Sequence, residues 1–207
     1  MPTAPGIDAA VTRSGLVRAA LDIARRAHAG QVRNASGGRP YIDHPIAVAE
    51  LLAERGFPDE VLASALLHDV VEDSELGVED VREATCERVA EIVDALTDDA
   101  DIEPYAQRKA EHRRRVEGAG PQALAVYAAD KLANVSMLRD AYATEGERVA
   151  EELKVPLDEK VAIWEEDLEM LRRRSAEYPL LADLADELAE QLSGLARDRA
   201  AEARRAS

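Results

Sequence analysis

The sequence predicts an all-α fold in one compact domain, and three features of its 207 residues support this. Hydrophobic residues make up 46% of the chain but aromatic residues only 3%, so the core must consist mainly of Ala, Leu and Val. Alanine and leucine are strong helix formers. Apolar residues recur at helical spacing along most of the chain, and no pattern typical of a β-hairpin occurs.

The composition also excludes several classes of protein. The formal net charge is −16, which is unsuited to binding a nucleic-acid backbone. No apolar run of about 18 residues occurs, and the N-terminus lacks the pattern of a signal peptide. Cys86 is the single cysteine, so no intrachain disulfide can form. We therefore expect a cytoplasmic protein that binds neither nucleic acid nor membrane, while its oligomeric state stays unknown.

The first third of the chain begins with a loose segment. Residues 1–13 are small and punctuated by proline and glycine, and we expect a flexible tail there. A helix follows over 14–29, with Ser14 as its N-terminal cap. The glycine-rich segment 31–41 predicts a loop, after which Asp43 caps a second helix.

A third helix, over 58–73, is apolar nearly all round, which predicts that it is buried. The remaining helices are expected over 78–85, 87–96, 104–117, 122–142, 147–153, 157–177 and 180–196. The chain is therefore divided into a flexible tail (1–13), a core (14–142), C-terminal helices that pack on the core (143–197) and a frayed end (198–207).

The predicted helix over 58–73 carries polar residues that a buried helix should not contain: His68, Asp69, Glu72 and Asp73. Burial of unpaired charge is strongly unfavourable. His68 and Glu72 are four residues apart and are expected to share one face of the helix, and Asp69 and Asp73 the adjacent face. A metal ion would give these groups a common partner, and the alternative is an ordinary helix-end cap or salt bridge.

Two further positions favour the metal. Asp130 is an acid in the middle of the second buried helix, with Asn134 one turn on, and His44 stands at the start of a helix. Two histidines and two aspartates suit Mn²⁺, Fe²⁺ or Zn²⁺, and the shortage of cysteine disfavours a closed structural zinc site. A divalent metal makes bound water more acidic, and Glu72 is placed to orient or deprotonate that water.

These residues resemble a known signature. His44, His68-Asp69 and Asp130 match the H…HD…D pattern of the HD phosphohydrolases. The surrounding segments are similar to the hydrolase domain of RelA/SpoT-type enzymes, and most similar to the stand-alone small alarmone hydrolases. Those segments are His28-Ala29-Gly30-Gln31-Val32-Arg33, Pro40-Tyr41-Ile42-Asp43-His44-Pro45, the run from Ala65 to Asp73, and the run from Ala129 to Asn134. The resemblance covers about residues 16–140 and includes no sign of a synthetase domain.

The resemblance implies an HD-domain helical fold with extra C-terminal helices, and an enzyme of the stringent response. Such enzymes use Mn²⁺ to remove the 3′-pyrophosphate from guanosine tetra- and pentaphosphate (ppGpp and pppGpp). The implied metal ligands are His44, His68, Asp69 and Asp130. Glu72 and Asp73 would act on the nucleophilic water. Substrate contacts are expected from Arg33 on the guanine base, Asn134 on the sugar or phosphate region, and from Lys131 and Arg108.

Some positions depart from the family pattern and leave other functions open. Asn34 and Ala133 stand where the family usually has a basic and an aromatic residue. The same chemistry could therefore act on another phosphorylated nucleotide, such as the 2′-phosphate of NADPH or a nucleoside monophosphate. A third candidate is a weakly active nucleotide-binding protein.

A local basic segment spans Pro104 to Arg115 and contains Arg108, Lys109, Arg113, Arg114 and Arg115. It would either steer a polyphosphate towards the site or form a solvated helix face with internal ion pairs. His112 within it is expected at the surface, and His28 is expected to pack beside the site.

Overall fold

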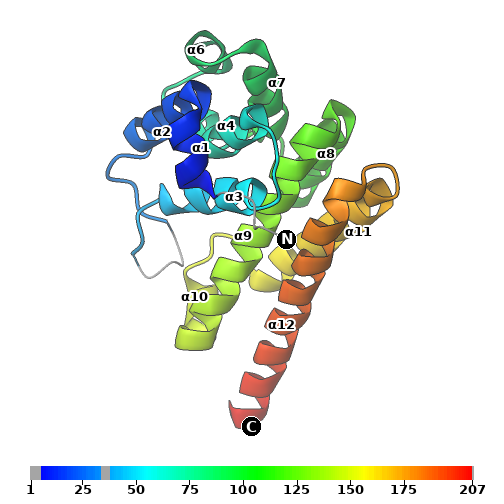
Figure 1. The fold of residues 1–207 in the computed structure, drawn as a ribbon. Coiled ribbons are helices and arrows are strands. Elements are labelled where there is room, and N and C mark those ends of the chain that lie inside the picture. Colours follow the sequence, from blue (N-terminus) through cyan, green and yellow to red (C-terminus); the bar gives the residue numbers. More distant parts are fainter. Residues whose placement is uncertain (1–5, 34–37, 207) are drawn as a thin grey trace. The chain divides into compact units, whose positions relative to one another are not determined.

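The structure is a computed structural model that describes residues 6–33 and 38–206 (Figure 1). These residues form helices and loops without any strand, apart from an isolated antiparallel bridge between Val32 and Pro40. The all-α prediction is therefore confirmed. Asn34, at which the sequence departs from the family pattern, lies outside the described residues.

The helices are α1 (Ile7–Arg13), α2 (Gly15–Ala27), α3 (Asp43–Ala53), α4 (Asp59–Leu67), α5 (Val70–Asp73), α6 (Val78–Ala84), α7 (Glu87–Leu96), α8 (Tyr105–Ala119), α9 (Pro121–Glu145), α10 (Arg148–Glu151), α11 (Leu157–Ser175), η1 (Pro179–Leu181) and α12 (Ala182–Ala206). The chain divides into two compact units. Unit 1 comprises Met1–Gln31 and Tyr41–Asp130, and unit 2 comprises Val32–Pro40 and Lys131–Ser207. The division falls inside α9, whereas the sequence placed a boundary near residue 142.

Helix α4 is the centre of unit 1. Every residue from Val61 to Leu67 is buried, as its apolar sequence predicted. It packs against α2, α3 and α7 (Figure 1). The start of α2 follows the predicted capping, because the Ser14 side chain accepts a hydrogen bond from the Val17 amide at 3.4 Å. Asp43 is the first residue of α3, so the cap position predicted for Asp43 is occupied by Ile42.

The expected tail over 1–13 is wrong in its second half, because α1 forms there. Ile7 and Ala10 are buried, and the Ile7 amide donates to Glu50 Oε2 at 2.6 Å. This bond spans 43 residues, so a tertiary contact rather than a local signal orders the segment.

The predicted helix over 58–73 is also interrupted. Helix α4 ends at Leu67, and α5 begins at Val70, so His68 and Asp69 occupy the break between two helices. The sharing of faces that a continuous helix would impose on His68 and Glu72 therefore does not apply. The directions of the His68 and Glu72 side chains are therefore determined by tertiary contacts and not by their spacing along one helix.

In unit 2, α11 and α12 pack side by side and are joined by η1. Arg199 binds Asp158 across this pair at 2.7 Å. Helix α12 also approaches the C-terminal half of α9, where Arg139 pairs with Asp198 at 3.0 Å. A Cβ at Gly194 would lie 2.3 Å from Arg139 Cζ, so a larger residue there would displace the guanidinium from its present position. The frayed end expected over 198–207 is wrong, because α12 continues to Ala206.

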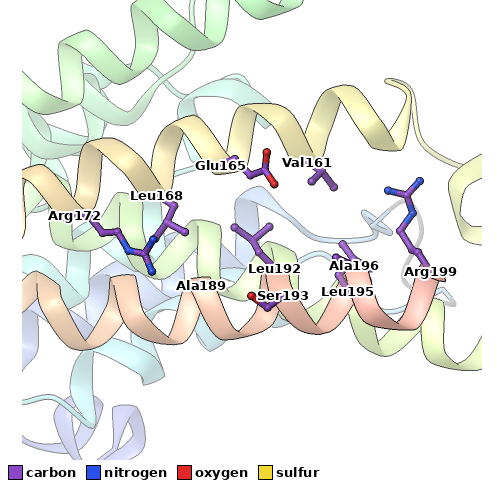
Figure 2. Close-up of a pocket in the computed structure, with 10 residues that line it drawn as sticks. All are labelled: Val161, Glu165, Leu168, Arg172, Ala189, Leu192, Ser193, Leu195, Ala196 and Arg199. Carbon is purple, nitrogen blue, oxygen red and sulfur yellow. The ribbon is translucent and has the colours of Figure 1, made fainter. Parts of the chain in front are cut away.

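A cavity of 260 Å³ lies between α11 and α12 (Figure 2). Leucine, valine and alanine side chains form much of its lining, with Glu165, Arg172 and Arg199 as its charged side chains. Glu165 is the one carboxylate in this lining, so the cavity offers no group of metal ligands. Among the residues that the structure describes, no helix is both long and apolar enough to cross a membrane.

Candidate metal centre

Three elements of unit 1 carry the four predicted metal ligands. His44 is in the first turn of α3, His68 and Asp69 are at the α4–α5 break, and Asp130 is in α9. The residues that precede His68 in α4 and Asp130 in α9 are apolar and buried, so these polar side chains require a polar partner or a ligand. The two apolar helices thus place Asp130 within α9 and His68 at the C-terminal end of α4.

The structure brings these side chains together. Ligand atoms of His44, His68 and Asp130 all lie within 4.8 Å of one another. His44 Nε2 is 2.9 Å from Asp130 Oδ1, and His68 Nε2 is 3.6 Å from the same oxygen. Asp69 lies beside this group, with Oδ1 3.1 Å from His68 Nε2 and Oδ2 3.8 Å from His44 Nε2. Two nitrogens and two carboxylates therefore lie close together, a set of donors that suits a divalent cation.

His68 supplies the test of whether these residues fit a metal. Its Nδ1 lies 2.7 Å from the Ala65 carbonyl oxygen, an arrangement that places the ring proton on Nδ1. Nε2 is buried and has no hydrogen-bond partner within the described chain. Burial alone would lower the pKa of His68, but the nearby carboxylates of Asp69 and Asp130 raise it well above its usual value. A buried, unsatisfied nitrogen that faces two carboxylates fits a metal ion.

Tyr41 is a residue of the site that the sequence did not predict. Its hydroxyl donates to Asp69 Oδ2 at 2.8 Å, and its ring stacks on His28 with centroids 4.7 Å apart. Burial, followed by the negative charges of Asp69 and Asp73, strongly raises the pKa of Tyr41, so the hydroxyl remains a donor. The sequence could have indicated this residue, because Tyr41 lies only three residues before the predicted ligand His44.

His28 extends this arrangement, in agreement with the packing role that we expected. Its Nδ1 lies 2.8 Å from Gln31 Oε1, and Gln31 Nε2 donates to the Asp73 carbonyl at 2.7 Å. The end of α2 is thereby linked to Asp73 through side chains and to Asp69 through Tyr41. Such outer contacts orient metal ligands.

Replacing Tyr41 with phenylalanine should weaken Mn²⁺ binding about tenfold, because an oriented ligand loses its partner while the ring stack stays. Isothermal titration of the metal-free protein with Mn²⁺ measures the change. Tyr178→Phe in unit 2, which removes a long contact of 3.4 Å to Arg174, is the matched control. Equal affinities for Tyr41→Phe and the wild type would refute the orienting role.

Glu72 on α5 is held by the loop that follows α7. Its carboxylate accepts a hydrogen bond from the Asp98 backbone amide. The residue keeps an exposed face, yet protein surrounds enough of the carboxyl to raise the pKa of Glu72 to about 7. Burial is the main cause, followed by the charge of Asp69, while the Asp98 amide and the Lys109 charge oppose it. This carboxyl can exchange a proton near neutral pH.

The raised pKa predicts a specific dependence of stability on pH in the metal-free protein. Between about pH 4.5, where an ordinary glutamate titrates, and about pH 7, folded Glu72 holds a proton that the unfolded chain has lost. Its contribution to the free energy of unfolding therefore falls as pH rises through this window. Glu72→Gln removes the dependence, so the variant should gain stability relative to wild type as pH rises.

Urea unfolding with chelator present, from pH 4.5 to 7.5, measures this difference; Glu75→Gln, an exposed neighbour, is the control. A constant difference between Glu72→Gln and wild type across the window would contradict the raised pKa.

Three of the four predicted substrate contacts lie in unit 2. The Arg33 guanidinium donates to Asn134 Oδ1, so the structure brings these two residues together. Lys131 follows the ligand Asp130 on α9 and is buried. Arg108 lies instead in unit 1, where its Nε is 3.4 Å from Asp98 Oδ2 and its NH1 is 3.6 Å from Glu103 Oε1.

The basic segment on α8 is engaged in contacts within the protein. Arg114 pairs with Glu111 at 2.5 Å, and Arg115 donates to the Asp94 carbonyl at 2.6 Å. The prediction that His112 lies at the surface is wrong. His112 and Val116, one turn apart, are the buried residues of α8, and the His112 ring meets the edge of Tyr127 at 5.4 Å.

Comparison with known proteins identifies the family to which the chain belongs. The profile of the HD domain family matches residues 20–155, which is most of unit 1 and the start of unit 2. The chain therefore belongs to the HD domain family. The individual relatives found by sequence and by structure carry more specific descriptions than the family does.

A solved structure described as a metazoan ortholog of SpoT that hydrolyzes ppGpp is 26% identical, with a TM-score of 0.66; the match covers 90% of this chain and 96% of that one. The guanosine-3′,5′-bis(diphosphate) 3′-pyrophosphohydrolase of Aquifex aeolicus is 32% identical over 72% of this chain and 22% of its own length. The bifunctional (p)ppGpp synthase/hydrolase SpoT of Escherichia coli is 46% identical over 39% of this chain and 11% of its own. The chain thus spans less than a quarter of the length of these two curated relatives.

Proposed function

We propose that this chain is a metal-dependent phosphohydrolase that removes the 3′-diphosphate of guanosine 3′,5′-bis(diphosphate) as pyrophosphate. The observation that carries the proposal is the convergence of His44, His68 and Asp130, with Asp69 beside them. The activities described for these relatives support the choice of nucleotide. We further propose a cytoplasmic location, because one cysteine and no disulfide suit a reducing compartment.

In this proposal, His44, His68, Asp69 and Asp130 hold one divalent ion. Mn²⁺ is our first choice, and Fe²⁺ or Zn²⁺ would suit the same nitrogen and carboxylate donors. When bound, the ion supplies a Lewis acid that polarises a phosphoryl oxygen and makes water more acidic.

The protein's own residues would supply proton transfer and binding. Glu72 takes the proton of the attacking water on a carboxylate oxygen, since its pKa of about 7 suits a general base. Asp73 assists the same water. Arg33, Asn134 and Lys131 bind the nucleotide, because they supply planar and cationic hydrogen-bond donors for a base and phosphates. Arg108 already has acidic partners in the structure, so we rank it last among the contacts.

A substrate panel with Mn²⁺ tests the proposal. The wild type and Asp69→Ala are incubated with ppGpp, NADPH and a nucleoside monophosphate, and pyrophosphate and phosphate are measured separately. We expect pyrophosphate from ppGpp with the wild type alone. Phosphate from NADPH or the monophosphate would instead favour the second candidate substrate class, which Ala133 motivates. Tight binding of ppGpp without product would favour the weakly active binding protein.

A further inference from the structure

Helix α8 is linked to Glu72 by a short chain of contacts through Asp98. Lys109 Nζ on α8 lies 2.5 Å from Asp98 Oδ2. The backbone amide of the same residue, Asp98, donates to the Glu72 carboxylate. One loop residue thus faces α8 with its side chain and Glu72 with its main chain.

The surroundings of Asp98 strengthen its contact with Lys109. Its side chain is 12% exposed and that of Lys109 is 21% exposed, so water screens the pair only in part. Arg108 Nε and His112 Nδ1 flank the same carboxylate at 3.4 Å and 3.6 Å. Burial would raise the pKa of Asp98, but the hydrogen bond and charge of Lys109 lower it overall, so the carboxylate stays charged. The loop is also fastened from α8 by Arg115, which donates to the Thr97 carbonyl.

We propose that Asp98 and Lys109 are positioning residues that hold Glu72 in place for proton transfer. This inference rests on the proposed function and extends it to a loop that the metal ligands do not touch. A general base must lie within hydrogen-bond reach of the proton that it takes, so a free loop would cost rate rather than substrate binding. The basic segment of α8 then acts on the site through the pairing of Lys109 with Asp98.

Lys109→Met should lower kcat for ppGpp about tenfold, a part of the about 10²–10⁴-fold that a general base contributes. KM and Mn²⁺ affinity should stay within about twofold, because neither the nucleotide nor the ligands lose a contact. Asp98→Asn should act in the same direction, and Lys109→Arg should retain most of the rate because it keeps the charge. Arg114→Gln, which breaks an exposed α8 ion pair to Glu111, is the matched control.

A double-mutant cycle separates this role from a structural or substrate-binding one. In the Glu72→Gln background, Lys109→Met should cause no further loss, because both changes act through the same carboxylate. An additional loss, or a rise in KM, would show that Lys109 acts on the substrate or on stability, and would overturn the inference. An unchanged kcat for Lys109→Met would also overturn it.

Hydrogen exchange distinguishes failure of this inference from failure of the proposed function. Exchange of the Asp98 amide in the 97–104 segment should become faster in Lys109→Met and in Glu72→Ala, but not in Arg114→Gln. If the wild type does not hydrolyse ppGpp, the proposed function is lost, and this exchange pattern still supports the link from α8 to Glu72. Unchanged exchange in Lys109→Met would refute the link even if the enzyme is active.

Discussion

Replacing Asp130 with alanine will abolish hydrolysis of ppGpp and the stabilisation of the protein by Mn²⁺ together. Asp130 Oδ1 is the oxygen that both histidines approach, at 2.9 Å from His44 Nε2 and 3.6 Å from His68 Nε2. A metal ion contributes several kcal/mol to the stability of a hydrolytic transition state, so kcat/KM should fall by at least about 10³-fold.

The stability measurement makes this prediction independent of the substrate. A ligand present at about 100 times its Kd stabilises a folded protein by about 2.7 kcal/mol. Thermal unfolding of wild type with and without Mn²⁺ should therefore show a clear rise in Tm, which Asp130→Ala lacks. Asp140→Ala, an exposed acid on the same helix, should keep the full rise. A normal rise in Asp130→Ala would remove this residue from the metal centre.

The helices that bury long apolar stretches could be predicted from sequence alone. Helix α4 and the apolar half of α9 show this, because burial on every side leaves a clear compositional pattern. Helix α1 could not be predicted, since seven residues carry little periodicity and its order depends on the distant Glu50. The break after Leu67 was missed for the same reason. Nothing local in the sequence ends that helix, and the side chains that meet there come from other helices.

The residues of the site also fall into those that the sequence indicates and those that only the structure reveals. Polar residues inside apolar helices drew attention to His68, Asp69 and Asp130, and the structure brings them together with His44. Asp98 gave no such signal, because it stands in a loop beside other acids, and only the fold shows which of them faces Lys109 and Glu72. Residues that support a site through the backbone amide cannot be recognised from side-chain chemistry.

Glu72→Gln gives the sharpest separation between metal binding and proton transfer. The amide is isosteric with the carboxylate, and its carbonyl oxygen can still accept the hydrogen bond from the Asp98 amide. The variant should therefore fold normally and keep the Mn²⁺-dependent rise in Tm that Asp130→Ala loses. It cannot take a proton from water, so kcat should fall by about 10²–10⁴-fold with KM little changed.

Comparison with Asp73→Asn decides which carboxylate is the base. Asp73 is adjacent in sequence, but its backbone carbonyl accepts a hydrogen bond from Gln31, and the carboxyl group with a pKa near neutrality is that of Glu72. Initial rates in Mn²⁺ from pH 6 to 9 should show a larger loss for Glu72→Gln than for Asp73→Asn. If Asp73→Asn loses more, Asp73 is the base, and the loop that carries Asp98 serves only to fasten α5. Loss of the Mn²⁺-dependent rise in Tm in Asp130→Ala, together with loss of proton transfer in Glu72→Gln, would then assign metal binding and proton transfer to these two side chains.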